Sequence, residues 1–151
     1  MTKYQRVSLF ALRLALGWLF IYAGITKIFD PAWSAAGYLK GAKTFAVLFG
    51  WMLDPSVLPF INFLNVWGLT LLGISLLVGG LIRYSAYAGV VLMTLYYLAA
   101  MNFPYPNSHT LLVDEHVIYS IALFVLAVFD VGQIWGFDGW LAHLGKMTKK
   151  T

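Results

Sequence analysis

Two long stretches without charge constrain the fold of this chain more than any other feature. No Asp, Glu, Lys or Arg occurs from Pro55 to Ile82 or from Tyr84 to Val113. About 20 apolar residues cross the hydrocarbon core of a bilayer, so each stretch has room for a transmembrane helix. Ionised side chains are costly in lipid, and the few polar residues within the apolar segments are therefore the candidates for function.

Hydropathy predicts an all-α polytopic membrane protein, an antiparallel bundle of four transmembrane helices. The expected spans are residues 7–29, 60–82, 84–103 and 111–131. Residues 30–59 form a long external loop between the first two helices. We expect this loop to lie on the membrane surface or to tuck over the helix ends as a lid, because so long a connection is rarely idle in a compact bundle. The chain is then one membrane domain, residues 1–151, with a cytoplasmic tail over 132–151.

The distribution of positive charge predicts the orientation. The cytoplasmic loops of membrane proteins carry an excess of Lys and Arg. We therefore expect this protein in the cell membrane with both termini in the cytoplasm. The expected inner residues are Lys3, Arg6, Arg83, Lys146, Lys149 and Lys150, and the outer ones are Lys40, Lys43 and Lys27. This bias accounts for the basic pI of about 9.4 better than nucleic-acid binding does. The absence of cysteine excludes disulfides and thiolate chemistry, so redox chemistry needs a bound substrate or cofactor.

Ionisable residues on the first and fourth predicted helices fall at matching depths. One stripe of the first helix carries Arg13, Gly17, Phe20, Gly24 and Lys27. Within it, Arg13 and Lys27 are separated by about 21 Å of helix rise. Because the fourth helix runs in the opposite direction, we expect a structural ion pair between Arg13 and Asp130. At the other end Lys27 is expected to pair with Glu115 or with Asp114.

Polar groups converge on the outer half of the bundle, which predicts a pocket between the helices there. Lys27, Glu115 and His116 are the candidate catalytic residues, since three titratable groups are costly to keep in an apolar surround. The candidate binding residues are Asn62, Asn65, Asn102, Tyr119, Trp33, Trp67 and Asp114. The helical wheel favours an inward direction for Glu115 and His116. Asp114 is as well explained as an N-cap of the fourth helix.

A metal site is the less favoured interpretation of the same region. Two imidazoles and a carboxylate can hold a transition metal, and the sequence offers His109, Asp114, Glu115 and His116. Their spacing is unspecific, and no metal is predicted.

Four segments together resemble the DoxX/DoxD family of four-helix membrane proteins. They are RLALGWLFIYAGITKIFDP, GLTLLGISLLVGGLIR, LLVDEHVIYSIAL and GQIWGFDGWL, in that order. The resemblance implies a redox-linked role, best known as the membrane subunit of thiosulfate:quinone oxidoreductase. In that reaction thiosulfate is oxidised to tetrathionate and quinone is reduced.

The resemblance also implies roles for the candidate residues. His116, Lys27 or Tyr119 would hold the quinone carbonyls, and Glu115 with His116 would supply protons. Lys27, with Lys40 or Lys43 from the lid, would offset the charge of a small sulfur anion. The alternative is a non-catalytic anchor or partner subunit of a soluble oxidoreductase, and a second subunit or a second copy of the chain is an expected partner in either case. A transporter is disfavoured because four short helices form only a small pore and no broken helix marks a midplane site.

Overall fold

The computed structural model describes residues 1–106 and 108–147, and every regular element in that part of the chain is helical. The four long helices are α1 (Lys3–Ile28), α4 (Leu58–Val78), α5 (Ile82–Ala100) and α6 (Glu115–Val128). The shorter ones are α2 (Ala36–Leu39), α3 (Ala46–Trp51), the 3₁₀ turn η1 (Val131–Gln133) and α7 (Phe137–Met147).

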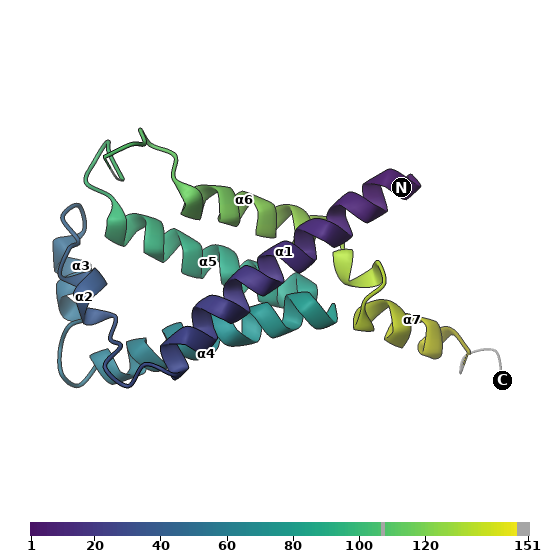
Figure 1. The fold of residues 1–151 in the computed structure, drawn as a ribbon, viewed down its shortest axis with the longest axis horizontal. Helices are drawn as coiled ribbons and strands as arrows, with labels where there is room; N and C mark the ends of the chain where they lie inside the picture. Colours follow the sequence, from purple (N-terminus) through teal and green to yellow (C-terminus); the bar gives the residue numbers. More distant parts are fainter. Residues whose placement is uncertain (107, 148–151) are drawn as a thin grey trace.

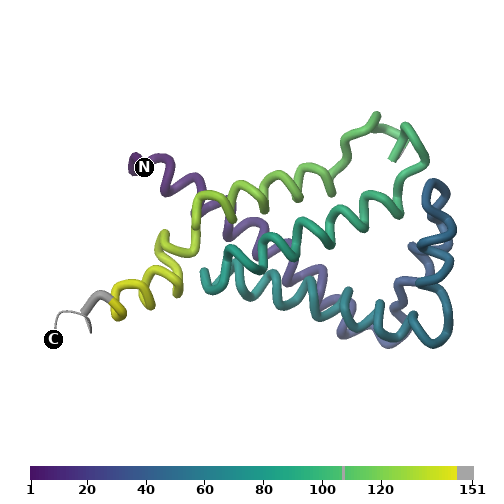
Figure 2. Tube along the Cα trace, turned by 180° about the vertical axis from the view of Figure 1, so that it is seen from behind, coloured from purple at the N-terminus to yellow at the C-terminus, as the bar shows by residue number. Residues whose placement is uncertain are grey.

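The helices form an elongated molecule, and segments that are far apart in the sequence meet at each of its two ends. α1 packs along α4, and α5 packs along α6 (Figure 1). The N-terminus and α7 lie at one end, whereas α2, α3 and the connection from α5 to α6 lie at the other (Figures 1 and 2). The segment between α1 and α4 therefore caps the end of the bundle that is remote from the N-terminus.

Local chemistry fixes where the helices begin and end. α1 begins with a capping box, in which the Thr2 hydroxyl accepts from Gln5 N and the Gln5 side chain accepts from Thr2 N. α4 ends at Gly79, whose φ of 76° lies in the left-handed region that glycine adopts without strain. α6 begins at Asp114, whose carboxylate accepts from the backbone amides of His116 and Val117. The expectation that Asp114 is an N-cap is thus confirmed.

Two helices, α1 and α4, are long and apolar enough to cross a membrane by length and composition. α6 is apolar but has only 14 residues, which corresponds to about 21 Å against a hydrocarbon core of about 30 Å. The expected helix over 111–131 is therefore too long at both ends. Asp114 starts the helix late, and Asp130, at φ 47°, follows its end.

Two glycines allow α1 and α4 to approach backbone to backbone. A Cβ atom on Gly24 would lie 2.7 Å from the backbone nitrogen of Thr70, and one on Gly73 would lie 2.3 Å from the backbone nitrogen of Ile21. Small residues at helix crossings permit such contact. The predicted stripe of α1 is also confirmed, because Arg13, Gly17, Phe20 and Gly24 are all buried.

The core is narrow and the outer faces of the helices are apolar. Phe20, Leu76 and Leu126 are almost completely buried between the long helices. Large apolar side chains such as Trp18 and Val91, 67% and 62% exposed, project away from this core. A bundle that carries its apolar residues on both faces is typical of a protein whose solvent is lipid.

The expected ion pair between Arg13 and Asp130 is wrong. Arg13 is 1% exposed, and its Nη1 donates to the backbone carbonyls of Val131 and Ile134, each at 3.0 Å. Nη2 donates to Trp135 O at 3.3 Å. Asp130 is exposed, because the chain turns sharply after α6 and presents carbonyl oxygens to the guanidinium instead.

The tail is held to the bundle through these carbonyls and through Asp138. The Asp138 carboxylate accepts from the backbone amides of Leu81 and Ile82 at 2.8 and 3.2 Å, which are unsatisfied donors at the start of α5. Asp138 N in turn donates to Gly79 O. The conspicuous GQIWGFDGWL segment thus joins α1, α4 and α5 at one end.

Candidate functional site

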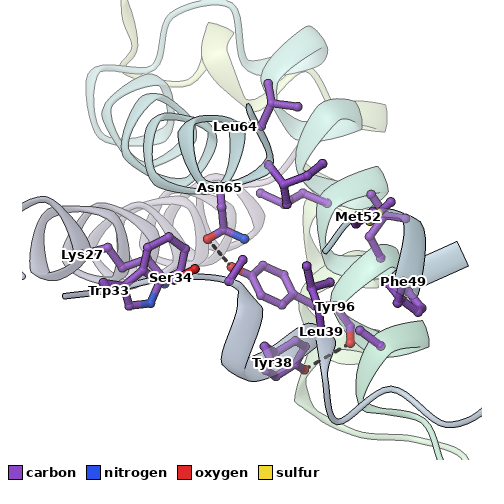
Figure 3. A pocket seen from close by; sticks show the side chains of 15 residues that line it. Lys27, Trp33, Ser34, Tyr38, Leu39, Phe49, Met52, Leu64, Asn65 and Tyr96 are labelled. Carbon is purple, nitrogen blue, oxygen red and sulfur yellow. Dashed lines mark hydrogen bonds between the residues drawn. The ribbon is translucent and has the colours of Figure 1, made fainter. Parts of the chain in front are cut away.

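A cavity of about 440 Å³ lies between α4, α5 and the segment that joins α1 to α4. Figure 3 looks into it: Lys27 and Trp33 stand on one side, Phe49 and Met52 on the other. Most of its surface is apolar, and its polar groups come from Lys27, Ser34, Tyr38, Asn65 and Tyr96. A mostly apolar cavity with a few polar groups is typical of a site for a small molecule.

The segment between α1 and α4 forms one wall of the cavity. Ala35, Leu39 and Phe49 pack with Ala99 of α5 in a second small core, so the segment tucks over the ends of α4 and α5. Asn62 fixes its start, since the amide oxygen of Asn62 accepts from Ala35 N at 2.9 Å. Asn62 therefore supports the wall and does not line the cavity.

Tyr38 joins this wall to α5. Its hydroxyl donates to Tyr96 O at 3.1 Å, and the two rings meet edge to face. Burial, with smaller contributions from Tyr96, Asp114 and Glu115, raises the pKa of Tyr38 to about 12. The phenol consequently remains a neutral hydrogen-bond donor over the physiological pH range.

Among the described residues that line the cavity, Lys27 is the only cationic one. Its ammonium donates to Ala23 O at 3.1 Å and lies 5.3 Å from the centroid of the Trp33 ring. The expected ion pair with Glu115 or Asp114 is wrong, because a carbonyl of its own helix and an aromatic face supply the contacts instead. An ammonium carries three donors, so Lys27 retains donors for a ligand.

Asn65 and Tyr96 connect α4 and α5 across the cavity. The Tyr96 hydroxyl donates to Asn65 Oδ1 at 2.6 Å, drawn as a dashed line in Figure 3. This bond fixes the orientation of the amide through Asn65 Oδ1, and the hydrogen bonds described among residues 1–106 and 108–147 do not use Asn65 Nδ2. The donor groups of the cavity thus include the Lys27 ammonium and the Asn65 amide.

Asp114 and His116 lie behind Tyr96 and outside the cavity wall. His116 Nδ1 is 2.8 Å from Asp114 Oδ2, and the His116 ring stacks on Tyr96 with centroids 5.5 Å apart. Asp114 is buried and Glu115 is exposed, which reverses the directions expected from the helical wheel. The reason is that Asp114 precedes the helix as its cap, in extended conformation, where wheel geometry does not apply.

The same three residues bring potential metal-ligand atoms together. One ligand atom each from Asp114, Glu115 and His116 lies within 4.8 Å of the others. The Asp114 carboxylate is engaged by two backbone amides and by His116 Nδ1, so the cluster is already explained as a helix cap.

The remaining predicted residues are elsewhere. Asn102 is exposed and forms a turn with Tyr105, and Trp67 is 44% exposed beside Phe63. Tyr119 packs edge to face on Phe20 in the main core. Of the predicted set, only Lys27, Asn65 and Trp33 line the cavity.

Sequence reasoning missed two cavity residues, Tyr38 and Tyr96. No local pattern distinguishes them from the other tyrosines, since Tyr96 is followed by Tyr97 and Tyr38 lies in a four-residue helix. Tyr96 of α5 lies at the level of Asn65 of α4, and this position is the signal that could have identified it. Using that signal requires the register of the two helices to be known.

Apolar outer faces and a cavity with few polar groups at one end define a helical membrane protein with a candidate site for a small molecule. Comparison with family models gives the DoxX family, with residues 8–102 matched. The match covers more than half of the chain, and the protein belongs to the DoxX family. Comparison with curated proteins and with solved structures gives no match.

Proposed function

We propose that this protein is a quinone-linked membrane oxidoreductase whose cavity holds the quinone ring. The observation that carries the proposal is the pair of donors in an apolar cavity. Lys27 and Asn65 present unused N–H groups between aromatic and aliphatic walls. A quinone ring is flat and apolar and carries carbonyl oxygens that only accept, so it complements this donor set.

The proposal includes a bundle that crosses the cell membrane four times with both termini in the cytoplasm. The position of the N-terminus and α7 at the same end of the molecule supports an even number of crossings (Figure 1). α5, with 19 residues, and the shorter α6 complete the bundle, with the connections on either side of α6 making up the remaining depth. The cavity then opens toward the outer half of the bilayer.

Lys27 has the main chemical role in this proposal. Electron uptake by a quinone places negative charge on its carbonyl oxygens. A fixed ammonium in a water-poor site stabilises such charge far more than water-exposed lysine does. Asn65, held by Tyr96, donates to the ring without reorganising during the reaction.

A small sulfur anion such as thiosulfate is the proposed electron donor. Two thiosulfate anions lose one electron each and form the S–S bond of tetrathionate, while the quinone takes up both electrons and two protons to become quinol. Lys40 and Lys43 are exposed at the end of the molecule that carries the cavity and would attract the anion. No cysteine takes part, since the chain has none.

Protons reach the site, in this proposal, from His116 and the exposed Glu115. Both lie on the far side of the tyrosines that form the cavity wall: His116 stacks on Tyr96, and Glu115 acts electrostatically on Tyr38. Their role is to supply and orient protons through these neighbours, and they do not contact the ring.

The test uses purified protein in lipid nanodiscs with thiosulfate and a short-chain benzoquinone. Binding is measured as quenching of Trp33 fluorescence, taken as the difference between wild type and Trp33→Phe, and turnover is measured as quinol formation. Lys27→Met is expected to lower turnover by about 10²- to 10³-fold. The exposed Lys40→Met is the matched control for binding of the ring and is expected to quench like wild type.

Each result bears on a different part of the proposal. Quenching without thiosulfate-dependent turnover would refute thiosulfate as the electron donor but would still support the quinone site. Equal turnover in wild type and Lys27→Met would remove the role of Lys27. No quenching at any quinone concentration would leave a membrane anchor or partner subunit as the function.

A further inference from the structure

We infer that a second, almost entirely apolar groove between α4 and α5 holds the hydrocarbon tail of the ligand whose ring occupies the cavity. This inference rests on the proposed function and extends it to the ligand class, a ring that carries a long prenyl or alkyl chain. The groove has a volume of about 770 Å³, larger than the cavity itself.

The groove continues directly from the cavity. Leu64 of α4 and Leu92 and Leu95 of α5 line both spaces, so a chain attached to a ring in the cavity would enter the groove past these three side chains. From Leu64 to Val78 the groove follows α4 for about 21 Å, the length of an extended chain of several isoprene units. Phe137 of α7 closes its far end.

The chemistry of the groove suits hydrocarbon and excludes a polar group. Its two serine hydroxyls, Ser75 and Ser85, lie 2.6 Å apart and also reach the carbonyls of Gly80 and Ile82. A third hydroxyl of the lining belongs to Tyr84, which is 75% exposed. The serine hydroxyls are therefore paired with each other and with backbone, and almost all of the surface of the groove is apolar. The cavity, by contrast, offers the Lys27 and Asn65 donors, so the two spaces sort the two parts of an amphipathic ligand.

Small residues create the hollow. Gly68 on α4 and Ala88 on α5 line it where leucines would fill it. Leu71 and Val91, 58% and 62% exposed, stand at its rim and give it apolar edges. α4 and α5 are thus less closely packed against each other than α1 and α4, whose backbones are in contact.

The tail does not need a hydrophobic driving force to enter the groove. Lipid chains are as apolar as the groove, so transfer from lipid is nearly neutral. The ring supplies the preference, because once it is bound the tail is tethered at an effective concentration in the millimolar range. A free lipid chain has no such tether and is expected to exchange with the bulk bilayer.

Photo-crosslinking in nanodiscs tests the inference directly. The probe is a benzoquinone whose alkyl chain carries a diazirine near its end, and the comparison probe is the same chain without the ring. Adducts of the quinone probe are expected on groove residues such as Val78 and Tyr84, enriched about tenfold over the ring-free chain. An excess of tail-free benzoquinone is expected to remove this enrichment.

A groove-filling variant with a matched control completes the test. Ala88→Phe fills the middle of the groove, whereas Ala15→Phe adds the same ring to the exposed face of α1. We expect Ala88→Phe to abolish the enrichment and to leave quenching of Trp33 by tail-free benzoquinone unchanged. Ala15→Phe is expected to match wild type in both measurements.

The failure of the inference is distinguishable from the failure of the proposed function. If tail-free benzoquinone quenches Trp33 but adducts of the tailed probe spread over all lipid-facing helices like those of the ring-free chain, the ring site stands and the tail groove is refuted. If benzoquinone does not quench Trp33 and both probes label alike, the proposed function and the tail groove are both refuted.

Discussion

The close contact of α1 with α4 predicts opposite effects for the same substitution at two glycines of one helix. A Cβ on Gly73 would lie 2.3 Å from Ile21 N and 2.6 Å from Ile21 Cα. These are backbone atoms of the opposing helix, so neither can rotate away. A Cβ on Gly68 would meet only Leu92 Cδ2 at 3.6 Å, an ordinary contact.

The magnitudes follow from these distances. Gly68→Ala is expected to stabilise the fold by about 0.5–1 kcal/mol, because alanine loses less backbone entropy in a helix. Gly73→Ala gains the same stabilisation from backbone entropy, but its methyl group must push the two helices apart. Overpacking of this kind costs about 1–3 kcal/mol or more. The two variants should therefore differ by at least about 1–3 kcal/mol in the free energy of unfolding, with Gly73→Ala the less stable.

Thermal unfolding in detergent, followed by circular dichroism, measures the difference. A gap of 1–3 kcal/mol corresponds to about 2–12 °C in Tm for a chain of this size. The helix crossing described here is refuted if Gly73→Ala unfolds at the same temperature as Gly68→Ala, or at a higher one.

Two further predictions concern the tail and the loop before α4. Arg13→Met removes the donors to three carbonyls. It should destabilise the protein by at least about 2 kcal/mol and expose α7 to limited proteolysis. Arg83 is exposed, and Arg83→Met should have neither effect. The Ser56 hydroxyl and backbone amide lower the pKa of Asp54, so this carboxylate adds stability that is lost as pH falls through its folded pKa. Ser56→Ala should raise that pKa in an NMR titration, and an unchanged pKa would contradict the assignment.

Helical periodicity predicted the α1 stripe because it depends on one helix alone. Residues at intervals of three and four must share a face, and Arg13, Gly17, Phe20 and Gly24 do so in the structure. The pairing of charges between helices depends on register and on where each helix ends. Asp114 ends up buried and Glu115 exposed because α6 starts one residue after the cap, a detail that the apolar pattern from Leu111 onward conceals.

The sequence predicted some of the residues that line the cavity and missed others. Lys27 and Asn65 were found because polar residues near the ends of apolar helices are rare and conspicuous. Tyr38 and Tyr96 were not found because a tyrosine suits a core, a membrane interface or a site equally well. Their roles follow only from the fold of the segment between α1 and α4 over the end of α5.

Both errors of charge pairing have one physical cause. Arg13 and Lys27 were assigned carboxylate partners because lipid does not solvate a cation. Both instead bind backbone carbonyls, Arg13 at the turns after α6 and Lys27 at Ala23 of its own helix, and both lie against an aromatic ring. Carbonyl dipoles accept hydrogen bonds from a cation, as they do from Nη1 and Nη2 of Arg13, but they leave its charge uncancelled. Arg13 is enclosed, so its charge serves only to hold the tail, whereas Lys27 lines an open cavity and leaves there a positive charge that a carboxylate partner would have cancelled.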